Sequence, residues 1–102
     1  MSGERKSRGF WKQGKLTVSI SYDDTKLTFS GHDLDGYFGG DEYEYWITVG
    51  VDDLRKALGV AERSDIGDAA CTRVNEIMQV GETTWLDSHG VPYEFNSWVE
   101  WG

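Results

Sequence analysis

The sequence predicts an α+β fold, in which an antiparallel sheet of about four strands carries short helices packed on one face. Residues 15–49 contain segments where apolar and polar residues alternate, which is the period of a half-buried strand. Residues 52–89 instead place apolar residues three and four positions apart, which is typical of helices. Strands grouped before helices favour an α+β domain, and the expected element order is β-β-β-α-α-α-β.

The first two predicted strands form a hairpin. Residues 15–22 place four apolar side chains on one face: Leu16, Val18, Ile20 and Tyr22. A turn at 23–25 leads to the second strand over 26–31, with Leu27 and Phe29 on one face. A third strand, 42–49, has its more apolar face formed by Tyr43, Tyr45, Ile47 and Val49.

Three short helices and a last strand follow. Acidic residues suit the helix starts, and Gly59 and Gly90 suit two of the helix ends. The second helix begins at Ser64 or Asp65, which are favourable N-cap residues. The expected ranges are 52–59, 64–78 and 82–89 for the helices and 93–101 for the strand.

Length and composition indicate one domain. A chain of 102 residues suits a single core, which we place at 15–102, and residues 1–14 are expected to form a flexible basic tail. The single cysteine, Cys71, cannot form an internal disulfide, which fits a reducing compartment. No apolar run approaches the roughly 18 residues of a membrane span, and no signal peptide is recognisable. We therefore expect a cytoplasmic protein, a monomer or weak dimer, that does not contact membranes.

Charge is divided unevenly along the chain. Residues 1–15 hold five basic residues and one acid, a net charge of +4, whereas residues 16–102 hold five basic and 17 acidic residues, a net charge of −12. An acidic surface of this kind favours a cationic partner and repels nucleic acid. The expected partner is a cationic protein.

The acidic residues are densest at 33–46, where they alternate with aromatic residues and glycines. Carboxylates there would pair with basic residues of the partner, and aromatic side chains would supply apolar anchors. The alternative is a solvated acidic loop between two strands. The predicted partner-binding residues are Asp33, Asp35, Tyr37, Phe38, Asp41, Glu42, Tyr43, Glu44 and Trp46.

Metal binding is the sharpest alternative for this segment. Read as a twelve-residue calcium loop, residues 33–44 place Asp33, Asp35, Asp41 and Glu44 at ligand positions. The fifth position is Tyr37, however, and the sixth is Phe38, where the loop requires glycine. We therefore predict neither a metal nor another cofactor.

Catalysis has little support in the sequence. Carboxylate pairs such as Glu42 and Glu44 lack a nucleophile or an oxyanion-stabilising motif beside them. A Cys71–His89 dyad is conceivable, but no spacing signature supports it. We predict a protein that is not an enzyme and has no catalytic residues.

Trp46 admits two interpretations. It falls on the polar face of the third strand, so it is either an exposed anchor or part of a central strand covered by helices on both faces.

Two segments resemble a group of small acidic bacterial proteins of the actinobacterial type. Residues 27–34 and 42–49 are similar to a pattern G-x-D-L … Y-E-Y-x-x-x-V, and residues 85–95 to an ending W-L-x-x-x-G-I-P-F-x-F. In size and acidity these proteins are similar to immunity proteins of polymorphic toxin and contact-dependent inhibition systems. The resemblance implies no catalytic residue, and the basic N-terminus departs from the pattern.

These observations predict an acidic protein-binding module. The expected function is that of an immunity or antitoxin protein that occludes the active site of a cationic toxin domain, a nuclease. The alternatives are a DNA-mimic inhibitor of a phage-defence nuclease and a small metal-dependent hydrolase. A mimic needs acids spread in rows, whereas helix capping already explains Asp52, Asp53 and Asp65.

Overall fold

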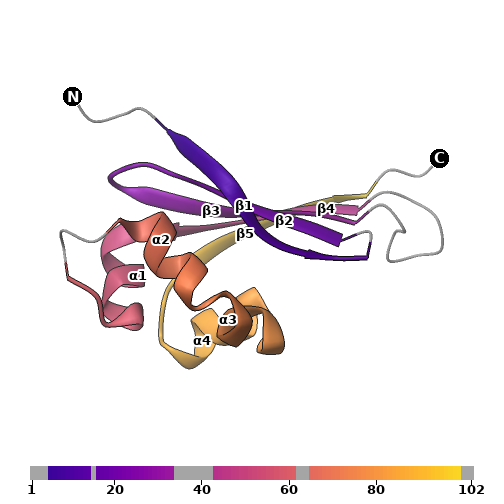
Figure 1. The fold of residues 1–102 in the computed structure, drawn as a ribbon. Coiled ribbons are helices and arrows are strands. Elements are labelled where there is room, and N and C mark those ends of the chain that lie inside the picture. The colour runs from indigo at the N-terminus through magenta and orange to yellow at the C-terminus, as the bar shows by residue number, and fades with distance from the viewer. Residues whose placement is uncertain (1–4, 15, 34–42, 62–64, 100–102) are drawn as a thin grey trace.

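The computed structural model describes residues 5–14, 16–33, 43–61 and 65–99. Five antiparallel strands form one sheet in the order β1-β2-β3-β4-β5, and four helices lie between β4 and β5 in the chain. The helices all lie on one face of the sheet (Figure 1). The predicted α+β class is confirmed. The elements are β1 (Lys6–Gln13), β2 (Leu16–Tyr22), β3 (Lys26–Asp33), β4 (Tyr43–Gly50), α1 (Val51–Leu58), α2 (Ile66–Thr72), α3 (Val74–Val80), α4 (Glu82–Ser88) and β5 (Tyr93–Val99).

Strand β1 corrects the prediction of a flexible tail over 1–14, which is wrong for the residues of this strand. Its buried apolar residue is Phe10, which is 8% exposed and packs edge-on against Phe29, with ring centroids 5.4 Å apart, and Trp11 is partly buried against the same core. The register shifts between Gly9 and Trp11, so Phe10 is an extra residue in a bulge and the period of two is interrupted. The bulge interrupts the alternation of apolar and polar residues, and the strand is also rich in basic residues, so the sequence pattern did not predict it.

Two basic residues of β1, and Arg5 just before the strand, are paired with acids of the domain. The guanidinium of Arg8 donates to Asp68 of α2, and Lys6 lies 4.0 Å from the carboxylate of Asp65. Arg5 forms an ion pair with Asp23 at 3.0 Å. These three N-terminal positive charges are thus paired within the fold.

The predicted hairpin of β2 and β3 is confirmed, with Tyr22 opposite Leu27 at its closed end. Asp23 fixes the turn, because its carboxylate accepts the backbone N–H groups of Thr25 at 2.8 Å and Lys26 at 2.9 Å. These hydrogen bonds lower the pKa of Asp23 to about 2.

The helices follow the predicted ranges with one difference. Helix α1 ends at Gly59, which adopts a left-handed conformation with φ 69°, and Asp65 caps α2 by accepting the N–H of Asp68 at 3.1 Å. The single helix predicted over 64–78 is interrupted at Arg73, whose φ of −105° and ψ of 15° leave the helical region. The break redirects the chain, so that α2 packs on β2 and α3 packs against β1.

One core fills the space between the helices and the sheet. Gly67 allows α2 to approach β2 closely, since a Cβ atom there would lie 2.3 Å from the ring of Tyr22. Trp85 is 2% exposed, and its indole N–H donates to Glu76 at 2.7 Å. The largest fully buried side chains are Phe29, Ile20, Leu27, Ile47, Leu54, Ile77, Leu86, Val18, Val49 and Val51.

The other face of the sheet is not covered by helices in the described part of the chain (Figure 1). Ile47 and Val49 of β4 are buried on the helix side, so Trp46 points to the opposite face, where it is half-buried. The interpretation of β4 as a strand covered by helices on both faces is therefore wrong. No helix among the described residues is long and apolar enough to span a membrane.

Candidate functional site

The structure describes part of the predicted partner-binding segment. Asp33 ends β3 and lies opposite Tyr43, which begins β4, so the two ends of the segment are neighbours in the sheet. Glu44 and Trp46 follow in β4. The remaining predicted residues lie outside the described part of the chain: Asp35, Tyr37, Phe38, Asp41 and Glu42.

Strand β4 divides its three predicted site residues between two faces. Alternation places Glu44 and Trp46 on the uncovered face, whereas Tyr43 shares the helix face with Tyr45. His32 of β3 is opposite Glu44, with 3.8 Å between Nε2 and the carboxylate. Two of the three predicted residues in β4 therefore share a face, and Tyr43 does not join them.

The uncovered face is rich in small hydroxyl side chains. Thr28 and Thr48 share a hydrogen bond of 3.1 Å, and Arg5 reaches across the strands to donate to Thr28 at 3.1 Å. Trp46 lies between Ser30 of β3 and Asn96 of β5 in the register. We call this surface the hydroxyl face and define it by Ser7, Thr17, Ser19, Ser21, Thr28, Ser30, Trp46 and Thr48.

A cleft opens on the helix side of β4. Its cavity volume is about 420 Å³. Tyr45 and Phe95 stack with ring centroids 6.3 Å apart and ring planes 13° apart. The ring centroid of Tyr43 lies 6.0 Å from that of Tyr45. We call it the Tyr45 cleft, and its lining residues are Tyr43, Tyr45, Ile47, Gly81, Glu82, Thr83 and Phe95.

Glu82 makes this cleft chemically distinct. Glu82 lines the cleft although it is only 7% exposed, and its carboxylate accepts a hydrogen bond from the hydroxyl of Tyr45. Among the described residues, no Lys, Arg or His lies within ion-pairing distance of Glu82. A buried carboxylate without a cation is costly, because buried charges are ordinarily paired.

Sequence reasoning missed the Tyr45 cleft. Glu82 has the sequence signal of an ordinary acid in the first turn of a helix, and Tyr45 that of a core residue in an alternating strand. A glycine provides the remaining clue, since a Cβ atom at Gly31 would lie 2.0 Å from the Tyr45 ring. The absence of a side chain at that position leaves the space that Tyr45 occupies.

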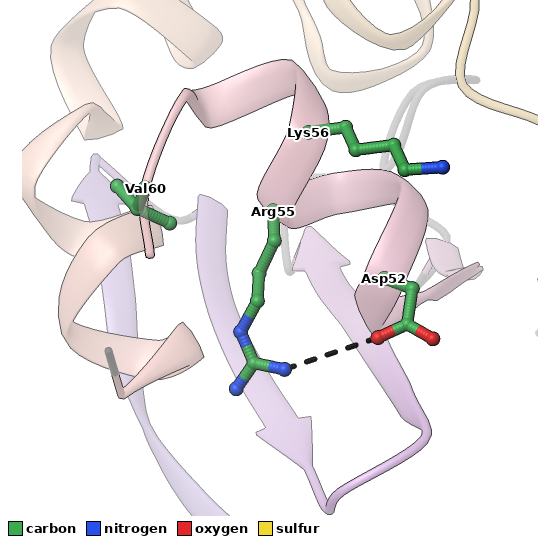
Figure 2. A pocket seen from close by; sticks show the side chains of 4 residues that line it. All are labelled: Asp52, Arg55, Lys56 and Val60. Carbon is green, nitrogen blue, oxygen red and sulfur yellow. Dashed lines mark ion pairs between the residues drawn. The ribbon is translucent and has the colours of Figure 1, made fainter. Parts of the chain in front are cut away.

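A second hollow, of about 300 Å³, lies beside α1 and is lined by Asp52, Arg55, Lys56 and Val60. Figure 2 shows the Arg55 guanidinium directed toward Asp52, at 4.0 Å, with Lys56 extending away from it. Arg73 is likewise paired locally, with Glu76 at 2.8 Å. Both arginines therefore form ion pairs with acids of their own helical region.

The residues considered for catalysis are not brought together. Cys71 belongs to α2, and partial burial raises the pKa of its thiol. His89 stacks on Trp85 with ring centroids 4.0 Å apart, and its Nδ1 lies 2.9 Å from the Trp85 carbonyl. Within the described ranges, Cys71 and His89 share no hydrogen bond, and no three His, Cys, Asp or Glu residues are grouped so as to hold a metal.

Comparisons of this chain with family models, with curated proteins and with solved structures find no significant match. The resemblance noted from sequence motifs therefore stays a prediction. Function has to be argued from the hydroxyl face, the Tyr45 cleft and the distribution of charge.

Proposed function

We propose that this protein is a binding module for a cationic protein, of the immunity or antitoxin type, which occludes the active site of a toxin domain such as a nuclease. The observation that carries the proposal is the shared orientation of Glu44 and Trp46 on the uncovered hydroxyl face. A carboxylate and a large aromatic side chain on a flat sheet surface can contribute charge attraction and apolar contact to the same partner.

The charge distribution supports a cationic partner. Residues 16–102 carry a net charge of −12, and Lys6 and Arg8 of β1 are already paired with Asp65 and Asp68. Arg55 and Arg73 are paired within their own helical regions. The negative potential thus remains available for long-range attraction, which raises association rates more than it raises affinity.

Trp46 can supply apolar contact area, which charged side chains alone do not. Exposed acidic side chains are screened by salt and contribute little to the lifetime of a complex. Tryptophan is enriched at the residues that dominate binding energy, where its area is buried against the partner. Trp46 is half-buried, and the small hydroxyl side chains beside it can present donors and acceptors to the partner.

The experiment is a growth-protection assay. The neighbouring genes are searched for a large secreted protein with a basic C-terminal domain, that domain is co-expressed with the chain, and protection is compared between wild type, Glu44→Lys and Trp46→Ala. The matched control is Asp24→Lys, the same charge change in the hairpin turn at the opposite end of β3. We expect both site variants to lose protection and complex formation while the control retains both. Protection by all three variants, with unchanged salt dependence of binding, would contradict the proposal.

A further inference from the structure

We propose that the Tyr45 cleft binds the guanidinium group of an arginine side chain. The identification of that arginine as part of a protein partner rests on the proposed function, but the chemistry of the cleft does not. Three features of the cleft favour this ligand: a buried carboxylate, stacked aromatic rings and an open mouth.

The buried carboxylate of Glu82 gives the cleft its charge preference. Its single side-chain donor among the described residues is the neutral hydroxyl of Tyr45. A cation in the cleft would complete the pairing that a buried carboxylate ordinarily has. A neutral or anionic ligand would leave Glu82 without a counter-charge.

The aromatic rings distinguish a guanidinium from a simple ion. Tyr45 and Phe95 are nearly parallel, and Phe95, which lines the cleft, is 46% exposed. Guanidinium groups are planar and weakly hydrated, and they stack on aromatic faces while donating to carboxylates. A small, strongly hydrated metal ion would gain nothing from such walls.

Glycine keeps the cleft open. Gly81 lies on its wall with φ 97°, a conformation that residues with a side chain rarely adopt, and no side chain narrows the cleft at that point. Gly31 leaves room for Tyr45 to lie over β3. The volume of about 420 Å³ accommodates the end of an arginine side chain.

The test uses the whole chain and small probes. Aromatic ¹H–¹³C spectra are recorded during titration with N-acetyl-arginine amide at constant ionic strength, and with N-acetyl-norleucine amide as the uncharged control. We expect saturable shifts of the Tyr43, Tyr45 and Phe95 rings with the arginine probe alone. Equal shifts with norleucine, which would indicate a merely apolar cleft, or no saturable shift with arginine, would overturn the assignment.

Two variants localise the response. Glu82→Gln should weaken the arginine response about tenfold because a charge-assisted contact is lost, whereas Glu94→Gln, on the opposite face of β5, should not.

Since Glu82→Gln alters a buried position, Phe95→Ala at the exposed rim gives a second measure, with Val80→Ala as its exposed apolar control. We expect a few-fold weakening for Phe95→Ala and none for Val80→Ala. Equal responses in site and control variants would refute the assignment.

Failure of this inference is separable from failure of the proposed function, because the titration contains no partner protein. A saturable arginine response combined with no growth protection supports the cleft and removes the immunity function. Growth protection combined with no arginine response removes the cleft and keeps the hydroxyl face as the binding surface.

Discussion

Trp85 and Trp46 lie on opposite sides of the same sheet and illustrate two uses of a large aromatic residue. Trp85 is buried on the helix side, its indole N–H bound to Glu76 and its ring stacked with His89. Trp46 is half-buried on the hydroxyl face, and Ser30 and Asn96 are its neighbours across the strands. The difference indicates that the core around Trp85 maintains the fold, and Trp46 is the residue through which we propose that a partner binds the uncovered side.

Replacing each tryptophan by alanine should lower the stability of the folded protein by very different amounts. Trp85→Ala should lower the free energy of unfolding by about 3–5 kcal/mol, because a buried ring and its hydrogen bond are lost together. Trp46→Ala should cost about 1 kcal/mol, since a half-buried side chain loses less buried area. Urea denaturation of both variants measures the difference. Equal losses of unfolding free energy in the two variants would mean that Trp46 stabilises the fold as much as Trp85 does, which would contradict its assignment to a binding surface.

Gly31→Ala tests how closely Tyr45 packs against β3 on the helix side of the sheet. The added Cβ atom would meet the Tyr45 ring at 2.0 Å, so the ring must shift, and we expect a loss of about 1–3 kcal/mol. Gly9→Ala in β1 is the matched control, because nothing lies within 4 Å of the Cβ position there. Thermal or urea unfolding of the two variants tests whether close packing at Tyr45, rather than glycine removal from a strand, causes the loss.

The smallest expected effect concerns acid stability, away from both tryptophans. Hydrogen bonds from Lys26 and Thr25 lower the pKa of Asp23 to about 2, compared with about 3.9 in an unfolded chain. Because the folded-state pKa is depressed, Asp23 contributes stability above about pH 4 and loses it as the pH falls toward 2.

Asp23→Asn should therefore be less stable than wild type at pH 7, and the difference should shrink progressively between about pH 4 and pH 2. Urea unfolding across this range measures it. Asp24→Asn is the control, since in the described part of the chain the Asp24 side chain accepts no hydrogen bond. A pH-independent difference for Asp23→Asn would show that the carboxylate charge does not matter.

Local patterns predicted most of the fold. The period of two in β2, β3 and β4 and the glycine after α1 were sufficient to place these elements. Strand β1 was missed because the bulge at Phe10 interrupts its alternation and its basic residues are neutralised by α2, far away in the sequence. The break at Arg73 was missed because the apolar spacing continues across it.

The candidate site was less accessible to sequence reasoning. Alternation in β4 does predict that Glu44 and Trp46 share a face and that Tyr43 lies opposite them. The Tyr45 cleft could not be predicted, because Glu82 and Phe95 approach β4 only through the packing of α4 and the pairing of β5. Such tertiary neighbours leave no local pattern in the sequence.

The most direct test of the central claim is ¹⁹F NMR of the chain labelled with 5-fluorotryptophan, with resonances assigned through Trp46→Phe and Trp85→Phe. The spectrum is recorded alone and with the cationic domain used in the growth assay. We expect the Trp46 resonance to shift or broaden on binding while the Trp85 resonance stays in place. Complex formation that leaves the Trp46 resonance unmoved would contradict it.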